Sequence, residues 1–247
     1  MDSYVSFADF YDGLTENVEY AKRCEYILDV FKKHSHKPEL LLDLACGTGS
    51  LTVELAKNGI DVYGVDASQE MLCQAQSKAM EEELQIFFLC QQMQNLELYG
   101  LIDTCVCTLD SINHLESEED VQATFNGVSE YMEKSGVFLF DVNTLYKHRE
   151  ILANNTFVYD TEEVFCVWQN TLCEDDVVEI DLDFFELDED GAYIRSSESF
   201  CEKAYSHEKI VEMLENAGFK LLACYGDMSF EAPKDDEQRA VYVAQKL

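Results

Sequence analysis

The stretch LLDLACGTGS, residues 41–50, decides the fold of this chain. It begins as a short apolar run that holds Asp43, and it continues into a turn of small residues with Gly47 and Gly49. Glycine lets the backbone turn sharply and approach a ligand with no Cβ in the way. Residues 51–58 then have a helical pattern, and the first N–H groups of a helix are free to bind a polar or negative group. A strand, a glycine turn and a helix in this order predict one unit of a parallel α/β sheet with a ligand at the turn.

Strand and helix signals alternate through the first 144 residues, beginning with a helix at residues 20–33. Ser68 and Ser117 are suited to cap two further helices. Further strands are expected at residues 61–65, 84–89, 102–109 and 136–142. This alternation predicts a sheet with helices on both faces and a ligand site at the carboxyl ends of its strands. Polar residues stand at these ends: Asp43, Asp66, Gln91, Asp110 and Asp141.

The pattern changes after Asn143. Three β-rich runs, at residues 156–172, 177–187 and 192–200, predict a three-stranded antiparallel unit. A helix after Ser206 and two strands, at residues 219–225 and 240–246, return to the main sheet as an antiparallel edge. We therefore predict a doubly wound, mostly parallel seven-stranded α/β sheet of the Rossmann-like kind. Residues 1–144 and 206–247 form its core, and residues 145–205 form an inserted antiparallel β subdomain that contacts the substrate or acts as a lid.

The net charge of the chain limits the classes of molecule that it is expected to bind. Its 247 residues include 50 acids and 17 bases, a formal net charge of -33. Nucleic-acid backbones and anionic membranes need clustered Lys and Arg, so neither is an expected partner. A neutral or cationic small molecule fits better, bound by a monomer or homodimer. The sequence contains no signal-peptide pattern and no apolar run of membrane-spanning length, which favours a cytoplasmic location.

The ten cysteines include no CxxC pair and no regular spacing. In a chain of this length they are expected to be reduced thiols, and neither a disulfide scaffold nor a metal site is predicted.

The glycine turn suits a cofactor that contains adenosine. Asp66 follows Gly47 by nineteen positions at the end of the next strand, where an acid accepts hydrogen bonds from ribose hydroxyls. The NAD fingerprint needs a third glycine or alanine, and Thr52 stands in its place. An NAD-dependent oxidoreductase is therefore the disfavoured alternative. Asp43 favours S-adenosylmethionine, because it can anchor the glycine turn or meet the cofactor's ammonium group through water.

Four segments carry a family resemblance. Residues 42–49, LDLACGTG, resemble the first motif of class I S-adenosylmethionine-dependent methyltransferases, and residues 62–68 with Met71-Leu72 resemble the second. FADFYD at residues 7–12 and DSIN at residues 110–113 are similar to segments of a bacterial branch that acts on small molecules of unassigned identity. The resemblance implies S-adenosylmethionine as cofactor and methyl transfer to nitrogen or oxygen. A protein that binds the cofactor without catalysis remains an alternative.

Methyl transfer to oxygen or to a strongly basic amine needs a general base, and His114 is the best-placed candidate, with Asp110, Asp141 and Tyr205 as weaker ones. Gln92 stands where the family often has an aspartate. Tyr11 resembles a lid residue, although an ordinary core position is equally compatible, and Asn113 and His114 also suit a helix cap or a filled crevice. The expected cofactor contacts are Tyr11, Asp43, Ala45, Gly47, Gly49, Asp66, Ala67, Met71, Gln92, Met93, Leu109 and Asp110.

Overall fold

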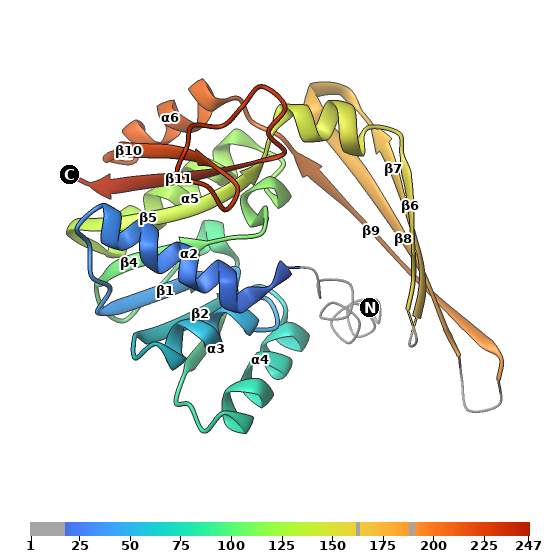
Figure 1. Cartoon of the computed structure of the whole chain (residues 1–247), viewed down its shortest axis with the longest axis horizontal. Coiled ribbons are helices and arrows are strands. Elements are labelled where there is room, and N and C mark those ends of the chain that lie inside the picture. Colours follow the sequence, from blue (N-terminus) through green and yellow to red (C-terminus); the bar gives the residue numbers. More distant parts are fainter. Residues whose placement is uncertain (1–17, 162–163, 188–190) are drawn as a thin grey trace.

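Seven strands form the central sheet, in the spatial order β10-β11-β5-β4-β1-β2-β3 (Figure 1). This computed structural model describes residues 18–161, 164–187 and 191–247. The strands are β1 (Leu40–Leu44), β2 (Asp61–Asp66), β3 (Phe87–Cys90), β4 (Ile102–Cys107), β5 (Met132–Asn143), β10 (Phe219–Gly226) and β11 (Arg239–Lys246). Strands β1 to β5 pair in parallel, and β11 is antiparallel to both β5 and β10. The predicted mostly parallel seven-stranded sheet is confirmed, and only β11 runs against the other strands.

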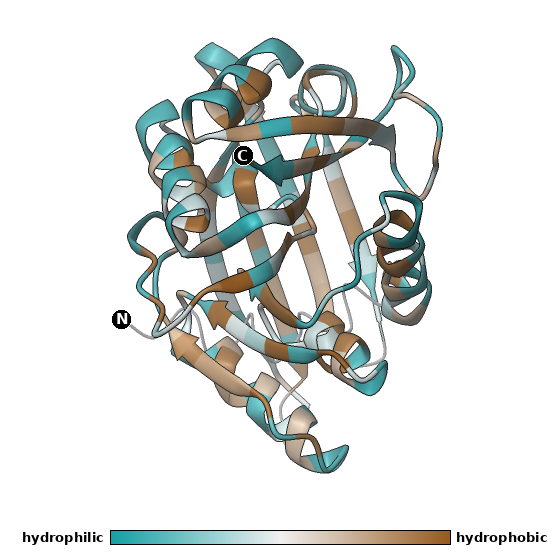
Figure 2. Cartoon of the chain, turned by 90° about the vertical axis from the view of Figure 1, so that its left-hand side faces the viewer, coloured by the Kyte–Doolittle hydropathy of each residue, from teal (hydrophilic) through white to brown (hydrophobic). Residues whose placement is uncertain are grey.

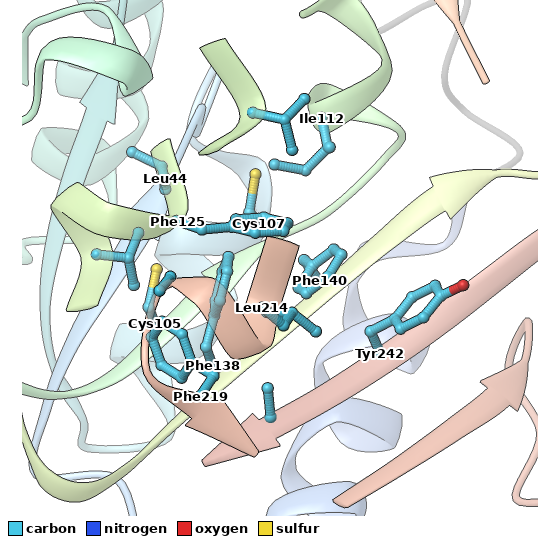
Figure 3. Close-up of a cluster of buried hydrophobic side chains, with 14 of the residues drawn as sticks. Leu44, Cys105, Cys107, Ile112, Phe125, Phe138, Phe140, Leu214, Phe219 and Tyr242 are labelled. Atoms are coloured by element: carbon cyan, nitrogen blue, oxygen red, sulfur yellow. The ribbon is translucent and has the colours of Figure 1, made fainter. Parts of the chain in front are cut away.

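Helices cover both faces of this sheet. They are α2 (Tyr20–Lys33), α3 (Ser50–Lys57), α4 (Gln69–Glu81), α5 (Glu118–Tyr131) and α6 (His207–Asn216). Helices α2 and α3 pack on one face in a cluster that includes Ile27 and Leu55. Helices α5 and α6 pack on the other face, where Phe125 lies against Phe138 and Phe140 of β5 (Figure 3). Figure 2 shows hydrophobic residues along the inner strands and hydrophilic residues on the outer sides of the helices.

Three of these helices begin at a serine cap. The caps at Ser68 and Ser117 were predicted, and the third helix was predicted to follow Ser206. The hydroxyl of Ser68 accepts the N–H of Met71 at 3.1 Å at the start of α4. Ser117 accepts the N–H of Asp120 at 3.0 Å at the start of α5. Ser206 begins α6 in the same way. Each cap satisfies an N–H group that has no partner inside the helix.

The inserted sheet has four strands and not the three that the sequence predicts. They are β6 (Thr156–Asp160), β7 (Val164–Leu172), β8 (Val177–Leu187) and β9 (Tyr193–Lys203), all antiparallel and in chain order. The long run at residues 156–172 divides because Thr161 and Val164 close a turn, with the Val164 N–H donating to the Thr161 hydroxyl at 3.0 Å. No glycine or proline marks this turn, so the composition gave no signal. These strands lie within residues 145–205, and the division into a core and a lid subdomain stays a prediction.

Several boundaries also differ from the expected ones. Strand β4 ends at Cys107 and not at Leu109, because Leu109 and Asp110 both adopt left-handed backbone conformations with φ of 58° and 56°. Strand β5 begins at Met132, directly after α5, and not at residue 136, where the sequence predicts its start. Among the helices of the described ranges, none is long and apolar enough to cross a membrane.

Gly49 offers a test of the packing between α3 and α4. Its φ is +74°, and a Cβ at this position would lie 2.7 Å from the Cβ of Ala75 in α4. Gly59 has a φ of +81°, and a Cβ there would have nothing within 4 Å. A substitution at Gly59 therefore measures the backbone strain alone, without the steric overlap that a Cβ at Gly49 would cause. We expect Gly49→Ala to lower the free energy of unfolding by about 2–4 kcal/mol, from backbone strain plus overpacking.

In the matched control Gly59→Ala, strain alone should cost about 1–2 kcal/mol. Urea unfolding of both variants is the measurement. Equal losses in the two variants would show that the approach of Gly49 to Ala75 does not constrain the fold.

Candidate functional site

A cavity of about 470 Å³ opens at the carboxyl ends of β1, β2 and β3. It is lined by Ala45, Gly47, Asp66, Ala67, Ser68, Glu70, Met71, Gln91, Gln92, Met93, Leu109, Ser111 and His114. A small adjoining pocket shares Ala45, Gly47, Leu109 and Ser111 with it and adds Asp43 and Tyr20. The sequence-predicted contacts at the glycine turn and at the ends of β2 and β3 therefore gather around one space. Its volume is in the ordinary range for a small-molecule site.

Asp66 joins the glycine turn to the start of α4. The N–H of Gly47 donates to Asp66 Oδ2 at 2.8 Å, and the N–H of Ser68 donates to Oδ1 at 2.8 Å. Burial raises the pKa of Asp66, while these N–H groups act in the opposite direction by stabilising the carboxylate. Each carboxylate oxygen can still accept a second hydrogen bond. Asp66 therefore holds the turn in place and remains able to bind a hydroxyl group in the cavity.

Asp43 is a buried acid beneath the small pocket. Its Oδ2 accepts the hydroxyl proton of Thr52 at 2.6 Å, and burial raises the pKa of its carboxyl group to about 7. Thr52 is the residue that stands in place of the third glycine of the NAD fingerprint, and here its side chain supports the buried acid. A cation that enters this pocket would stabilise the ionised form of Asp43.

Leu109 and Asp110 form a tight turn held by Asp141. The N–H of Leu109 donates to Asp141 Oδ2 at 3.0 Å, and that of Asp110 donates to Oδ1 at 2.8 Å. The turn places Leu109 in the wall of both pockets. The Asp110 side chain accepts hydrogen bonds from Arg239 and, at 2.8 Å, from Asn143. Its carboxylate is therefore committed to protein partners, and its predicted contact with a cofactor stays a prediction.

The segment after this turn meets the inserted sheet. Asn113 is buried, and its Nδ2 donates to the carbonyl of Lys203 in β9 at 2.9 Å, while its Oδ1 accepts the N–H of Asn143 at 2.8 Å. The ring of His114 lies 5.2 Å from that of Phe200, between ring centroids. Asn113 thus links the core to the insertion, and its neighbour His114 faces the cavity.

The remaining predicted residues have other surroundings. Gly49 packs against Ala75 of α4. The side chain of Tyr205 is buried, and its hydroxyl donates to the Leu115 carbonyl. Tyr11 lies outside the described residues. All ten cysteines are free thiols, as expected.

Sequence reasoning missed four residues of the cavity wall. Ser68, Glu70, Gln91 and Ser111 all line it. Each lies within two positions of a predicted contact, so widening the predicted segments would have included them. Ser68 and Ser111 also lie inside the segments that carry the family resemblance, and Gln91 stands at a predicted strand end.

Several known proteins with related sequences or structures are named as methyltransferases. A family model described as "Methyltransferase domain" matches residues 41–136. "Putative methyltransferase GWCH70_2453" of Geobacillus sp. (strain WCH70) is 35% identical over 246 residues, which cover 99% of this chain and 100% of that protein. The crystal structure of an S-adenosylmethionine-dependent methyltransferase from Clostridium acetobutylicum ATCC 824 is 34% identical, with a TM-score of 0.90 and 98% of each chain covered.

A more distant relative is a glycine/sarcosine N-methyltransferase of Aphanothece halophytica. It is 25% identical over 225 residues, which cover 90% of this chain and 81% of that protein.

Asp43 predicts a proton release when the cation S-adenosylmethionine binds. With a pKa of about 7, roughly half of the Asp43 carboxyl groups carry a proton at neutral pH. Because this pKa is raised above its usual range, the group favours the apo fold at low pH, and that contribution is lost as the pH rises through about 7. A bound cation favours ionisation, so we expect up to about half a proton to be released per site at pH 7.

Calorimetric titration at pH 7 in phosphate and in Tris measures this release, because the two buffers differ in ionisation enthalpy. Asp43→Asn should remove the difference between the buffers. The same binding enthalpy in both buffers for the unmodified protein would contradict the proposed position of the cation.

Proposed function

The chain belongs to the S-adenosylmethionine-dependent methyltransferases, and we propose that it methylates a nitrogen or oxygen atom of a neutral or cationic small molecule. The observation that carries this proposal is the shared cavity of the glycine turn, Asp66 and Leu109, with His114 in its wall. The site is thus a cofactor cleft with a titratable side chain beside it. A monomer or homodimer acting in the cytoplasm is part of the same proposal.

The cavity suits the parts of S-adenosylmethionine. Asp66 offers carboxylate oxygens to ribose hydroxyls, and Met71 and Met93 offer apolar surface to the adenine ring. Asp43 supplies an acid at the small pocket, where the ammonium group of the methionine part would lie. When bound, the cofactor supplies a methyl group that is already activated by a positively charged sulfur atom. The protein is left with alignment of the acceptor and exclusion of water.

His114 is our candidate for the general base. Its side chain is 46% exposed, so it can meet an acceptor in the cavity. A neutral amine needs no base, because it presents a free lone pair, whereas a hydroxyl group or a protonated amine must lose a proton. The relative from Aphanothece halophytica acts on nitrogen, by its name, which supports an amine acceptor.

The acidity of the chain supports the exclusion of nucleic acids and anionic membranes as partners. A net charge of -33 opposes the binding of polyanions and attracts cations. This is a statement about association, and it leaves the identity of the acceptor to experiment.

Methyl transfer from labelled S-adenosylmethionine into fractionated cell extract tests the proposal. We expect the label in the small-molecule fraction and not in RNA, DNA or protein. His114→Asn should lower turnover by about 10²–10⁴-fold, the usual contribution of a general base, and change cofactor affinity by no more than a few-fold.

Label in the nucleic-acid or protein fraction would contradict the small-molecule proposal. Full turnover in His114→Asn would remove this residue as the base. Glu118→Gln, on the exposed start of α5, is a matched surface control that should keep full turnover.

A further inference from the structure

Glu202 of β9 is a buried acid that the proposed function does not yet use. Its side chain is only 5% exposed, although it comes from the inserted sheet and not from the core. The Asn143 Nδ2 at the end of β5 donates to Glu202 Oε2 at 3.1 Å. A buried carboxylate is costly unless charged or polar groups compensate it. We therefore expect a charged or polar group beside this carboxylate.

Two imidazole rings flank this carboxylate. His114 Nε2 lies 3.9 Å from Glu202 Oε1 on the side of the cofactor cavity. His148 Nε2 lies 3.7 Å from Glu202 Oε2 on the buried side. The ring of His114 also lies against Phe200, two residues before Glu202 on the same face of β9. One strand of the insertion thus supplies both the packing surface and the charge beside His114.

His148 does not compete for the charge of Glu202. Its Nδ1 lies 2.9 Å from the carbonyl oxygen of Asp176, which can only accept, so Nδ1 carries the proton. Its Nε2 is buried without a hydrogen-bond partner, and burial lowers the pKa of this ring. His148 is therefore expected to be neutral at neutral pH, which leaves His114 as the imidazole that a charged Glu202 stabilises.

We propose that Glu202 is a positioning residue for His114: its carboxylate lies 3.9 Å from His114 Nε2 and stabilises the ring when Nδ1 takes a proton from the acceptor. The inference rests on the proposed function, because it assumes that His114 acts as the base. The arrangement has the logic of a nucleophile–histidine–carboxylate triad, in which the carboxylate orients the ring and stabilises its protonated form.

The proposal narrows the acceptor to a group that has a proton to lose. The lone pair of an acceptor oxygen or nitrogen forms a bond to the methyl carbon, and the carbon–sulfur bond breaks with its electrons left on sulfur. The acceptor proton moves to His114 Nδ1, so one positive charge passes from sulfonium to imidazolium. A hydroxyl group fits this step. A protonated amine fits it only if its proton moves to His114 first and frees the nitrogen lone pair, and a neutral tertiary amine does not need it.

Other charges act on the pair and must be considered in a pH study. Burial raises the pKa of Glu202, and the negative charge of Asp110 raises it further, while the positive charges of His114 and Lys147 lower it. Asp66 lines the same cavity as His114, and the positive charge of that ring lowers the pKa of Asp66. A change at Glu202 therefore has to be compared with a change at another acid on β9.

The test is an NMR titration of the His114 imidazole in the apo protein. The chain has five histidines, so His114→Asn identifies the signal by its loss. This measurement does not depend on catalytic activity. In Glu202→Gln we expect the titration midpoint of His114 to fall by roughly half a pH unit or more, because a neighbouring negative charge is lost. Glu198→Gln, four residues earlier on β9, is the matched control and should leave the midpoint unchanged.

An unchanged midpoint in Glu202→Gln would overturn the inference. Should that variant fail to fold, His114→Asn at its half-exposed position gives the reciprocal measurement. The titration midpoint of the Glu202 carboxyl carbon should then rise, since a cationic neighbour is lost, and no change would equally overturn the inference.

An activity measurement separates this inference from the proposed function. Turnover needs His114 unprotonated, so in Glu202→Gln the acid limb of the pH profile should move to lower pH and kcat should fall, with KM for S-adenosylmethionine within about twofold. Full kcat with an unmoved limb would reject the role of Glu202 and leave the methyltransferase function standing. Absence of transfer by the unmodified protein to any acceptor would instead reject the proposed function.

Discussion

The carboxylate of Asp141 is the contact on which the carboxyl edge of the sheet depends. It accepts the N–H groups of Leu109 and Asp110 and a hydrogen bond from Arg239 at 2.6 Å. Arg23 of α2 lies 3.7 Å away on its other side. Two successive left-handed residues without glycine cost about 1–2 kcal/mol each, and charge-assisted bonds offset such strain. One buried acid therefore shapes the turn that walls the cavity and ties α2 and β11 to the middle of the sheet.

The neighbouring strand ends use the same residue type in different ways. Asp66 receives two backbone N–H groups and faces the cavity, whereas Asp43 receives the hydroxyl of Thr52 beneath the small pocket. Burial raises the pKa of both carboxyl groups. A nearby cation would therefore stabilise the ionised form of each. A sulfonium cofactor with an ammonium group brings that charge. The strand ends thus place two acids where a positively charged ligand would stabilise their ionised forms, and the insertion adds Glu202 beside His114.

Local patterns were enough to predict the strand–turn–helix unit, the order of the sheet elements and the cavity contacts at Gly47, Asp66 and Met71, because each depends on residues close in the chain. The individual contacts of Asn113 and His114 with β9 could not be predicted, since residues about ninety positions apart meet through tertiary packing alone. The first hairpin of the insertion was missed because Thr161 turns the chain without glycine or proline. Gly49 was interpreted as a ligand contact, but its close approach to α4 gives a packing reason for glycine at that position.

The central claim is that the cavity at the carboxyl edge is a site for S-adenosylmethionine. Isothermal titration of the apo protein with S-adenosylmethionine, and separately with NADH, tests it most directly. We predict one site per chain with micromolar affinity for S-adenosylmethionine and negligible heat from NADH. Tight binding of NADH with no response to S-adenosylmethionine would contradict the account.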